Sequence, residues 1–287
     1  MLFDLSDRAK LRVSGGDRIR YLNGQVTNDV RKANANLSMA ACVISAKGKM
    51  DGFVFIAGEE DDLLLDTDPE LREALTQRLE RYVIADDVTI EDVTDRYALF
   101  HVTSEQPPAL PNEPLWRRGK RFGIAGWDVF VDATEHDRIW QLLAAKETAC
   151  DAECADRFRI EQGVPRWGRE LTGEIIPVEA HLETDAIDYA KGCYIGQEVI
   201  SRMKMSGQTN KRLCGLISLD NVALTPGTRI LAPGGEKDVG WITSATRSDR
   251  LGKEIALGYV KRGFNEPGSQ LLGPQAVEVV ALPFFSS

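Results

Sequence analysis

Residues 191–202 read KGCYIGQEVISR and form the most informative stretch of this 287-residue chain. Gly192 and Gly196 permit backbone shapes that other residues resist, and the sequence after Gly196 has a helical pattern. Between the two glycines lies a thiol, Cys193. A cysteine in a turn before a helix, two residues from Lys191, has two reasons for a lowered thiol pKa: a nearby cation and the N–H groups of the helix end. The alternative is a tight strand–helix connection in which the cysteine only packs.

Upstream of this stretch, the hydrophobic pattern predicts strands mixed with helices. LSMAACVISA and GFVFIAG flank Lys47-Gly48-Lys49, which is typical of a β-hairpin with a glycine turn. The expected helices include one with Asp17 as its N-cap and one that begins at Asp68-Pro69 and carries Tyr82 on its apolar stripe. Further strands are expected at LRVSG, LLLDT, VTIEDV, YALFHVT and WDVFVD. This order suggests a ferredoxin-like α+β lobe.

Downstream of about Ser206 the texture of the sequence changes. Short apolar runs alternate with Gly- and Pro-containing turns, and no strong helical pattern remains. The runs are KRLCGLISL, TRILA, GWITSAT, IALGYV and AVEVVAL. They predict a small antiparallel barrel or sandwich at the C-terminal end of the chain.

Composition limits the classes of partner and compartment. The chain carries 35 Lys and Arg against 44 Asp and Glu, a formal charge of −9, which disfavours a broad nucleic-acid-binding surface. No segment approaches the ~18–20 apolar residues of a membrane span, and MLFDLSDRAK lacks the apolar centre of a signal peptide. Five cysteines are an odd number, so we expect reduced thiols in a cytoplasmic protein. Cys150 and Cys154 provide only half of a zinc ligand set, and no metal site is predicted.

The string KGCYIGQE closely resembles the K-G-C-Y-x-G-Q-E signature of the YgfZ-type folate-binding proteins. This family is a branch of the superfamily that includes the aminomethyltransferase (T-protein) of the glycine cleavage system. Five further blocks resemble superfamily patterns: GDRIRYLNGQVTNDV, SAKGKMDGFVFI, RIEQGVPRWGRE with IIPVEAHLE, GWITSAT and IALGYVKR. The likeness spans roughly residues 11–262. Its signature comprises Lys191, Gly192, Cys193, Tyr194, Gly196, Gln197 and Glu198.

The resemblance implies an α+β fold, a cloverleaf of two intertwined lobes followed by the antiparallel barrel. The expected folate-binding domain covers residues 1–205, with one lobe formed by about 1–36 and 132–205 and a ferredoxin-like lobe by 37–131. The barrel domain is expected at residues 206–287.

The resemblance also implies tetrahydrofolate, or a folate derivative, as the ligand. Glu179 lies at the position where the transferases bind the pterin, and a carboxylate can accept two parallel N–H bonds from a pterin edge. Glu161 is a second candidate, and Arg202 and Arg212 are candidates for the glutamate tail. Glu161 can equally be a surface residue near a helix end, and Arg202 and Arg212 can belong to a solvated basic linker.

Departures from the transferases favour the YgfZ-type branch. The transferases have Asn-Ala at a strand end and a functional Asp soon after it, whereas this chain has Asp66-Thr67 and then Glu73. The branch implies an accessory protein that supports iron–sulphur client enzymes, indirectly tRNA modification, with Cys193 as the functional thiol. Its partners would be folate and client proteins, with no direct nucleic acid and no membrane. The alternative is a folate-dependent aminomethyltransferase or other C1-transfer enzyme.

Overall fold

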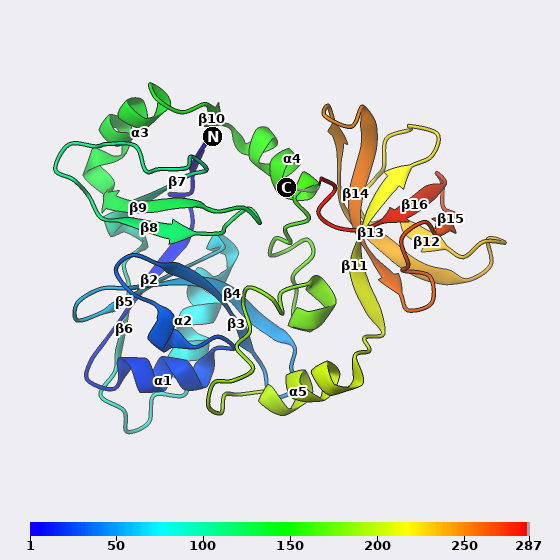
Figure 1. Ribbon diagram of the computed structural model, residues 1–287. Helices are drawn as coiled ribbons and strands as arrows, with labels where there is room; N and C mark the ends of the chain where they lie inside the picture. Colours follow the sequence, from blue (N-terminus) through cyan, green and yellow to red (C-terminus); the bar gives the residue numbers. More distant parts are fainter. Residues whose placement is uncertain (286–287) are drawn as a thin grey trace. The chain divides into compact units, whose positions relative to one another are not determined.

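Alternating apolar residues build an antiparallel sheet in the ferredoxin-like lobe of the computed structural model, which describes residues 1–285 (Figure 1). Its strand order is β3-β4-β5-β2-β6, and α2 packs on β2 and β4. Strands β4-β5-β2-β6 with α1 and α2 form a split βαβ unit, and β3 is added at one edge. The ferredoxin-like lobe expected at residues 37–131 did not include β2 and α1, which belong to this unit, and it included residues 97–131, whose strands belong to the second sheet. The Lys47–Lys49 hairpin is confirmed, because β3 pairs with β4 and Cys42 lies opposite Phe53. The elements are β2 (Ala9–Ser14), α1 (Arg18–Gln25), β3 (Ser38–Ile44), β4 (Met50–Gly58), β5 (Leu63–Thr67), α2 (Arg72–Glu80) and β6 (Thr89–Asp92).

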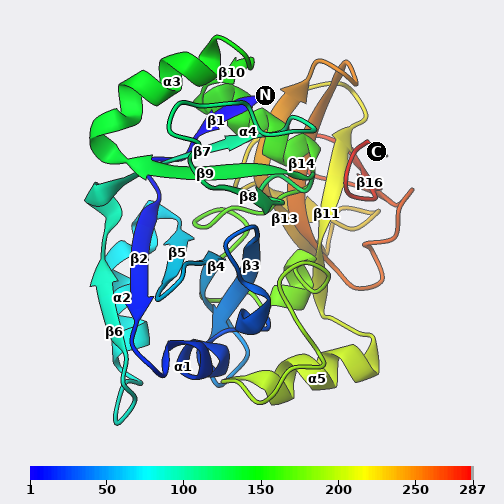
Figure 2. The ribbon, with the colours of Figure 1, turned by 60° about the vertical axis from the view of Figure 1, so that its left-hand side comes forward.

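A second five-stranded sheet has the order β10-β1-β7-β9-β8. The pair β1–β10 is parallel and the other pairs are antiparallel. Helix α3 covers this sheet, because Ile139 and Leu143 belong to the same buried cluster as Phe100 and Val129 (Figure 2). The elements are β1 (Leu2–Asp4), β7 (Tyr97–Val102), β8 (Trp116–Gly119), β9 (Gly126–Asp132), α3 (His136–Ala144) and β10 (Ala149–Cys150).

The C-terminal strands form a nearly closed six-stranded antiparallel barrel, which confirms the predicted α+β fold with a C-terminal barrel. Its order is β12-β13-β14-β11-β16-β15, and Leu231 and Leu272 exchange backbone hydrogen bonds of 2.7 and 2.9 Å to join its ends. Small and branched apolar side chains fill the interior. The strands are β11 (Lys211–Ser218), β12 (Arg229–Leu231), β13 (Asp238–Ser248), β14 (Lys253–Lys261), β15 (Gln270–Leu271) and β16 (Val277–Val280).

Helix α4 (Ala152–Glu161) packs on β13 through a buried polar network. Arg159 donates hydrogen bonds to Glu170 (3.0 Å) and to the Ser244 hydroxyl (2.7 Å), and that hydroxyl donates to Glu170 (2.6 Å). Because every charged member has a partner, the network can be buried at an acceptable cost. The other helical elements are α5 (Gln197–Ser206) and the 3₁₀ turns η1 (Val30–Lys32), η2 (Pro69–Leu71), η3 (Thr94–Arg96), η4 (Ala133–Glu135) and η5 (Pro177–Ala180).

The chain divides into two compact units. The first combines Met1–Asp151 with Glu183–Val199, and the second combines Ala152–Leu182 with the chain from Ile200 onward. The predicted division at residue 205 stays a prediction, because compactness alone does not define an independently folding domain. Within residues 1–285, no helix is both long and apolar enough to cross a membrane.

Two local predictions were wrong. The Asp17 side chain does not cap α1 but accepts a 2.9 Å hydrogen bond from the Asp87 backbone N–H. This bond ties the start of the helix to a distant loop, which the local sequence could not indicate. Tyr82 lies beyond the end of α2 and is 40% exposed, with Arg78 over its ring at 4.4 Å.

Candidate functional site

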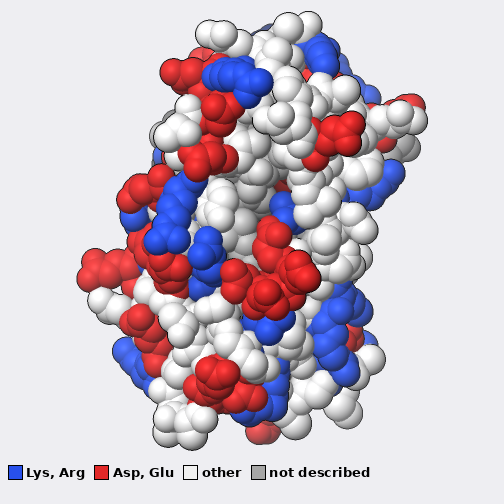
Figure 3. Space-filling view, turned by 90° about the vertical axis from the view of Figure 1, so that its left-hand side faces the viewer, with Lys and Arg blue, Asp and Glu red and all other residues white. Residues whose placement is uncertain are grey.

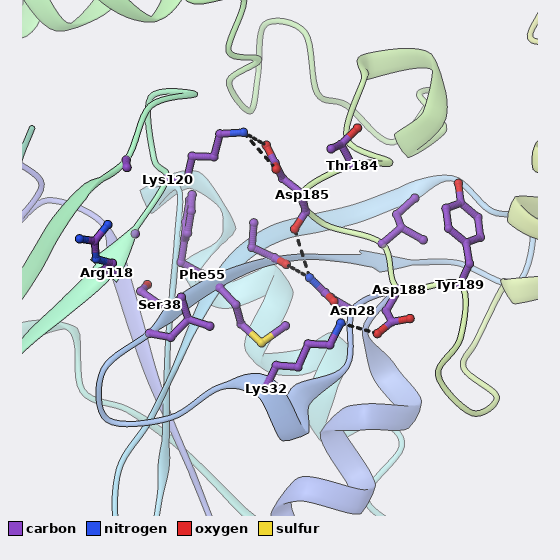
Figure 4. A pocket seen from close by; sticks show the side chains of 16 residues that line it. Asn28, Lys32, Ser38, Phe55, Arg118, Lys120, Thr184, Asp185, Asp188 and Tyr189 are labelled. Carbon is purple, nitrogen blue, oxygen red and sulfur yellow. Dashed lines mark hydrogen bonds and ion pairs between the residues drawn. The ribbon is translucent and has the colours of Figure 1, made fainter. Parts of the chain in front are cut away.

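A cavity of about 530 Å³ lies within the first unit (Figure 4). This volume falls in the range of small-molecule sites. The lining residues come from four separate parts of the chain: Asn28, Lys32, Leu37, Ser38, Met39, Ala40, Phe55, Arg118, Gly119, Lys120, Ala125, Thr184, Asp185, Ile187, Asp188 and Tyr189. The segment 184–189 forms one wall and continues directly into the KGCYIGQE signature.

The aromatic part of the lining is held by a buried ion-pair network. The guanidinium of Arg121 lies 4.2 Å from the centre of the Phe55 ring, a cation–π distance. Arg121 donates to both carboxylate oxygens of Asp66 (2.8 and 2.7 Å) and to Asp128 (2.8 Å). These three hydrogen bonds hold the Arg121 guanidinium in place. Its contact with Phe55 therefore holds the ring that lines the cavity.

Two lysine–aspartate ion pairs lie along the wall segment. Lys32 contacts Asp188 at 2.6 Å, and Lys120 contacts Asp185 at 2.9 Å (Figure 4). The Lys32 amine lowers the pKa of the Asp188 carboxyl through its hydrogen bond. The cavity therefore offers both cationic and anionic groups around an apolar interior, which suits an amphipathic ligand.

Asn28 joins the cavity walls to one another. Its side-chain amide nitrogen donates to the backbone oxygens of Ala40 (2.8 Å) and Asp185 (3.1 Å), and its side-chain oxygen accepts from the Asp29 N–H (2.9 Å). Both N–H donors of this amide, and its oxygen, are used here for structure. Asn28 thus fixes β3 and the 184–189 segment at the same point.

Lys191, the first signature residue, points inward. Its ammonium donates to the backbone oxygens of Asn23 (2.6 Å), Val26 (2.7 Å) and Asn28 (2.8 Å). Burial lowers the pKa of Lys191 to about 8. The sequence predicted a cation beside the Cys193 thiol, but all three ammonium protons have backbone acceptors.

The other signature residues divide into buried and exposed groups. Tyr194 is buried, and burial raises the pKa of its phenol. Gly196 has φ +81°, and a Cβ there would lie 2.4 Å from the Ser45 oxygen, so only glycine fits. Gln197 begins α5, and Glu198 is exposed in its first turn. Gly192 and Cys193 are exposed, and Cys193 is a free thiol.

Two of the predicted folate-binding residues lie on adjacent elements of the second unit. Glu179 in η5 is 4% exposed, accepts from the Ile176 N–H (3.1 Å) and forms an ion pair with Lys211 (3.2 Å). Arg212, the next residue along β11, lies 3.1 Å from Nδ1 of His181. His181 has φ +59°, an uncommon conformation for a non-glycine residue.

The other two predicted folate-binding residues lie elsewhere. Glu161, at the end of α4, accepts a 2.6 Å hydrogen bond from the Ser248 hydroxyl. This contact has a structural character, because it joins the helix to β13. Arg202 lies exposed on α5.

Comparisons with known proteins agree on one superfamily. Residues 211–286 match the family described as the glycine cleavage T-protein C-terminal barrel domain. An aminomethyltransferase of Shouchella clausii is 29% identical over 291 aligned positions, covering 91% of this chain and 78% of the relative. One from Streptomyces avermitilis is 25% identical, covering 99% and 86%. These similarities support membership of the glycine cleavage T-protein superfamily.

A solved structure shows the same fold over nearly the whole chain. The crystal structure of glycine cleavage system aminomethyltransferase T from Bartonella henselae has a TM-score of 0.86 and 16% identity, covering 99% of this chain and 86% of that chain. At this identity the likeness concerns the fold.

The two carboxylates that the resemblance placed at the transferase positions, Asp66 and Glu73, do not line the cavity. Asp66 is buried between Arg121 and Arg8. Glu73 is exposed on α2 and accepts a 3.0 Å hydrogen bond from Gln77. The carboxylates that line the cavity are instead Asp185 and Asp188.

The cysteines differ in burial and in disulfide bonding. Cys42 and Cys214 are buried free thiols, and burial raises the pKa of each to about 12. Cys150 and Cys154 are disulfide-bonded, so the prediction of reduced thiols was wrong for these two. The spacing of four residues allows this pairing, although the two cysteines were interpreted only as half of a zinc ligand set.

On the face that Figure 3 shows, Lys and Arg side chains are interspersed with Asp and Glu side chains. The cavity could not be recognised from the sequence, because its lining comes from four distant segments. The one available signal was the charge pattern of Asp185 and Asp188 immediately before the signature.

Proposed function

We propose that this protein is a cytoplasmic tetrahydrofolate-binding accessory protein that supports the assembly or repair of iron–sulphur cluster enzymes, with Cys193 as its functional thiol. The observation that carries the proposal is the combination of full-length similarity to aminomethyltransferases with an exposed free cysteine inside the KGCYIGQE signature. Its partners would be folate and the client proteins, without direct contact to nucleic acid or membranes.

The chemistry of the side chains fits a reduced folate. Glu179 presents a carboxylate of the kind that pairs with the N–H edge of a pterin, and Lys211 holds it in place. Arg212 offers a guanidinium for a glutamate-tail carboxylate. The first-unit cavity with Phe55 is a separate candidate site, because it has the size and lining for an aromatic moiety. When bound, the folate would supply its C1-carrying chemistry.

The surroundings of Asp66 favour the accessory role over aminomethyl transfer. A carboxylate that serves a reaction on folate must reach the ligand. Asp66 instead neutralises buried Arg121, and Glu73 lies exposed on α2. The residues at the transferase positions are therefore used for stability or solvation.

Calorimetric titration with tetrahydrofolate tests the binding. We expect saturable binding by the natural chain, weakened at least tenfold by Phe55→Leu where the ligand lies in the cavity, or by Glu179→Gln where it lies at Glu179. Glu73→Ala is the matched control, because this carboxylate is exposed, and it should leave the affinity unchanged. Absence of binding by the natural chain would remove the proposal. Unchanged affinity in Glu179→Gln would reject only the pterin contact.

Complementation of a strain that lacks the corresponding gene tests the thiol. We expect Cys193→Ser to bind tetrahydrofolate and yet fail to restore the activity of iron–sulphur enzymes. Full restoration by this variant would show that the thiol has no role.

A second candidate is folate-dependent aminomethyl or other C1 transfer, favoured by the names of the full-length relatives. Turnover of a methylamine donor with tetrahydrofolate as acceptor discriminates between the two. Turnover that is lost in a carboxylate variant such as Asp188→Asn would favour this candidate.

A further inference from the structure

The signature loop is anchored at two points on the chain around α1. The first anchor is the Lys191 ammonium, enclosed by three backbone oxygens between Asn23 and Asn28. The second is a 3.1 Å hydrogen bond from the Ile195 N–H to the Gly24 oxygen, followed by Gly196, which packs against the Ser45 oxygen. Between the anchors, Gly192 and Cys193 are exposed. The thiol therefore lies on a short turn whose two ends are fixed.

The first anchor is also part of the cavity wall. Asn28 accepts from Lys191 through its backbone oxygen, and its side chain holds Ala40 and Asp185, which line the cavity. The Thr27 hydroxyl adds a 2.6 Å hydrogen bond to the Ala186 oxygen in the same wall segment. The Asn28 side chain ties the wall segment to β3 (Figure 4). A displacement of the wall that keeps these bonds moves Asn28, whose backbone oxygen is one of the three acceptors of Lys191.

We propose that Lys191 is a positioning residue: its ammonium couples the exposed Gly192–Cys193 turn to the cavity wall through Asn28. A ligand that fills the cavity immobilises the wall and thereby the turn, so the thiol responds to occupancy. This ligand effect rests on the proposed folate binding, whereas the positioning role does not. Lys191 does not itself react with a substrate.

The alkylation rate of Cys193 measures the state of the turn. Iodoacetamide at pH 7.5 should label this thiol selectively, because the Cys42 and Cys214 thiols are buried with raised pKa values and Cys150 and Cys154 are disulfide-bonded. Mass spectrometry of Cys193→Ser gives the background. Amide hydrogen exchange at Ile195 gives an independent measure of the second anchor.

Lys191→Met removes the three donors and keeps most of the aliphatic stem. We expect Cys193 to be alkylated at least fivefold faster and the Ile195 amide to exchange at least tenfold faster. Lys47→Met, at an exposed lysine, is the matched control and should leave both rates within about 1.5-fold of the natural chain. An unchanged Cys193 rate in folded Lys191→Met would overturn the positioning role.

Tetrahydrofolate is the probe for the coupling. We expect saturating tetrahydrofolate to slow alkylation of the natural chain at least threefold, and to leave the rate of Lys191→Met unchanged although calorimetry shows that the variant binds it. Slowing that persists in the variant would mean direct shielding of the thiol and would overturn the coupling. If the natural chain does not bind tetrahydrofolate, the proposed function fails, while the ligand-free comparison still decides the positioning role.

If Lys191→Met does not fold, hydrogen exchange of the natural chain decides the coupling. We then expect the Ile195 amide to exchange at least threefold more slowly with tetrahydrofolate than without it. Equal exchange rates would overturn the proposal.

Discussion

Asp66 shows how much a single buried charge depends on its partners. Burial alone would raise the pKa of this carboxyl, but Arg121 and Arg8 outweigh burial and hold the pKa below its usual value. The ionised form therefore stabilises the folded state above the unfolded-state pKa, and this contribution is lost as the pH falls through the folded-state pKa. Removal of the charge would leave Arg121 without its bidentate partner.

We predict that Asp66→Asn lowers the free energy of unfolding by about 3–5 kcal/mol, because one partner of a buried pair is lost. Urea denaturation at pH 7 measures the change. Glu73→Gln, at an exposed position seven residues later, should change stability by less than about 0.5 kcal/mol. Equal effects of the two substitutions would contradict the role given to the Arg121 pair.

His136 provides a pH-dependent contact. Its hydrogen bond with Asp137 raises the pKa of the imidazole, burial opposes this, and a second bond with Asp4 (2.8 Å) raises it further. A raised pKa means that the contribution is present below the unfolded-state pKa of about 6.5 and disappears as the pH rises through the folded-state value.

We therefore predict that His136→Gln destabilises the protein more at pH 5.5 than at pH 8.0. The difference should be about 0.5–1 kcal/mol, because the groups are partly exposed. Thermal unfolding at the two pH values checks this. A larger cost at pH 8.0 would reverse the assigned sign.

The turn before α5 depends on one glycine of the signature and not on the other. Gly196 combines φ +81° with a Cβ position 2.4 Å from the Ser45 oxygen, whereas a Cβ at Gly192 would meet no atom within 4 Å. We predict that Gly196→Ala lowers stability by about 1–3 kcal/mol, and that Gly192→Ala changes it by less than about 0.5 kcal/mol. Differential scanning calorimetry of the two variants gives the comparison; a costly Gly192→Ala would contradict it.

At the scale of elements, the sequence correctly predicted the helices and strands that short-range patterns determine. The Lys47–Lys49 hairpin and the barrel strands have short-range signals, namely alternation and glycine turns. The Asp17 cap failed because Asp87, seventy residues away, supplies a competing donor. The sequence indicated that Lys191 is important, but its ammonium was predicted to lie beside the Cys193 thiol. It binds backbone oxygens instead, and these lie more than 160 residues away along the chain.

At the scale of the whole molecule, the charge of −9 predicts weak association with nucleic acid. Fluorescence anisotropy with labelled tRNA at physiological salt should show no saturation up to about 10 µM protein, since non-specific dissociation constants lie near 10⁻⁴–10⁻⁶ M even for proteins with basic contact surfaces. Saturable binding with a steep salt dependence would mean that a local basic surface overrides the net charge.

The cavity is likewise a product of the tertiary fold. Its lining comes from the chain around residues 28–40, 55, 118–125 and 184–189, and only the tertiary fold brings these together. The signature next to the cavity could be identified from the sequence, because its residues are consecutive. Phe55 could not be identified as a lining residue, because its ring is held by Arg121, in the turn after β8, and Arg121 is itself held by Asp66 of β5.

The paired backbone bonds between Leu231 and Leu272 have a consequence for behaviour at high concentration. A strand that ends a sheet normally offers unpaired N–H and C=O groups to any other strand, including one from a second copy. Where these two residues meet, those groups are already used within the barrel. This closure protects the C-terminal sheet from growing into intermolecular sheets, and its loss would first appear as aggregation of otherwise folded protein.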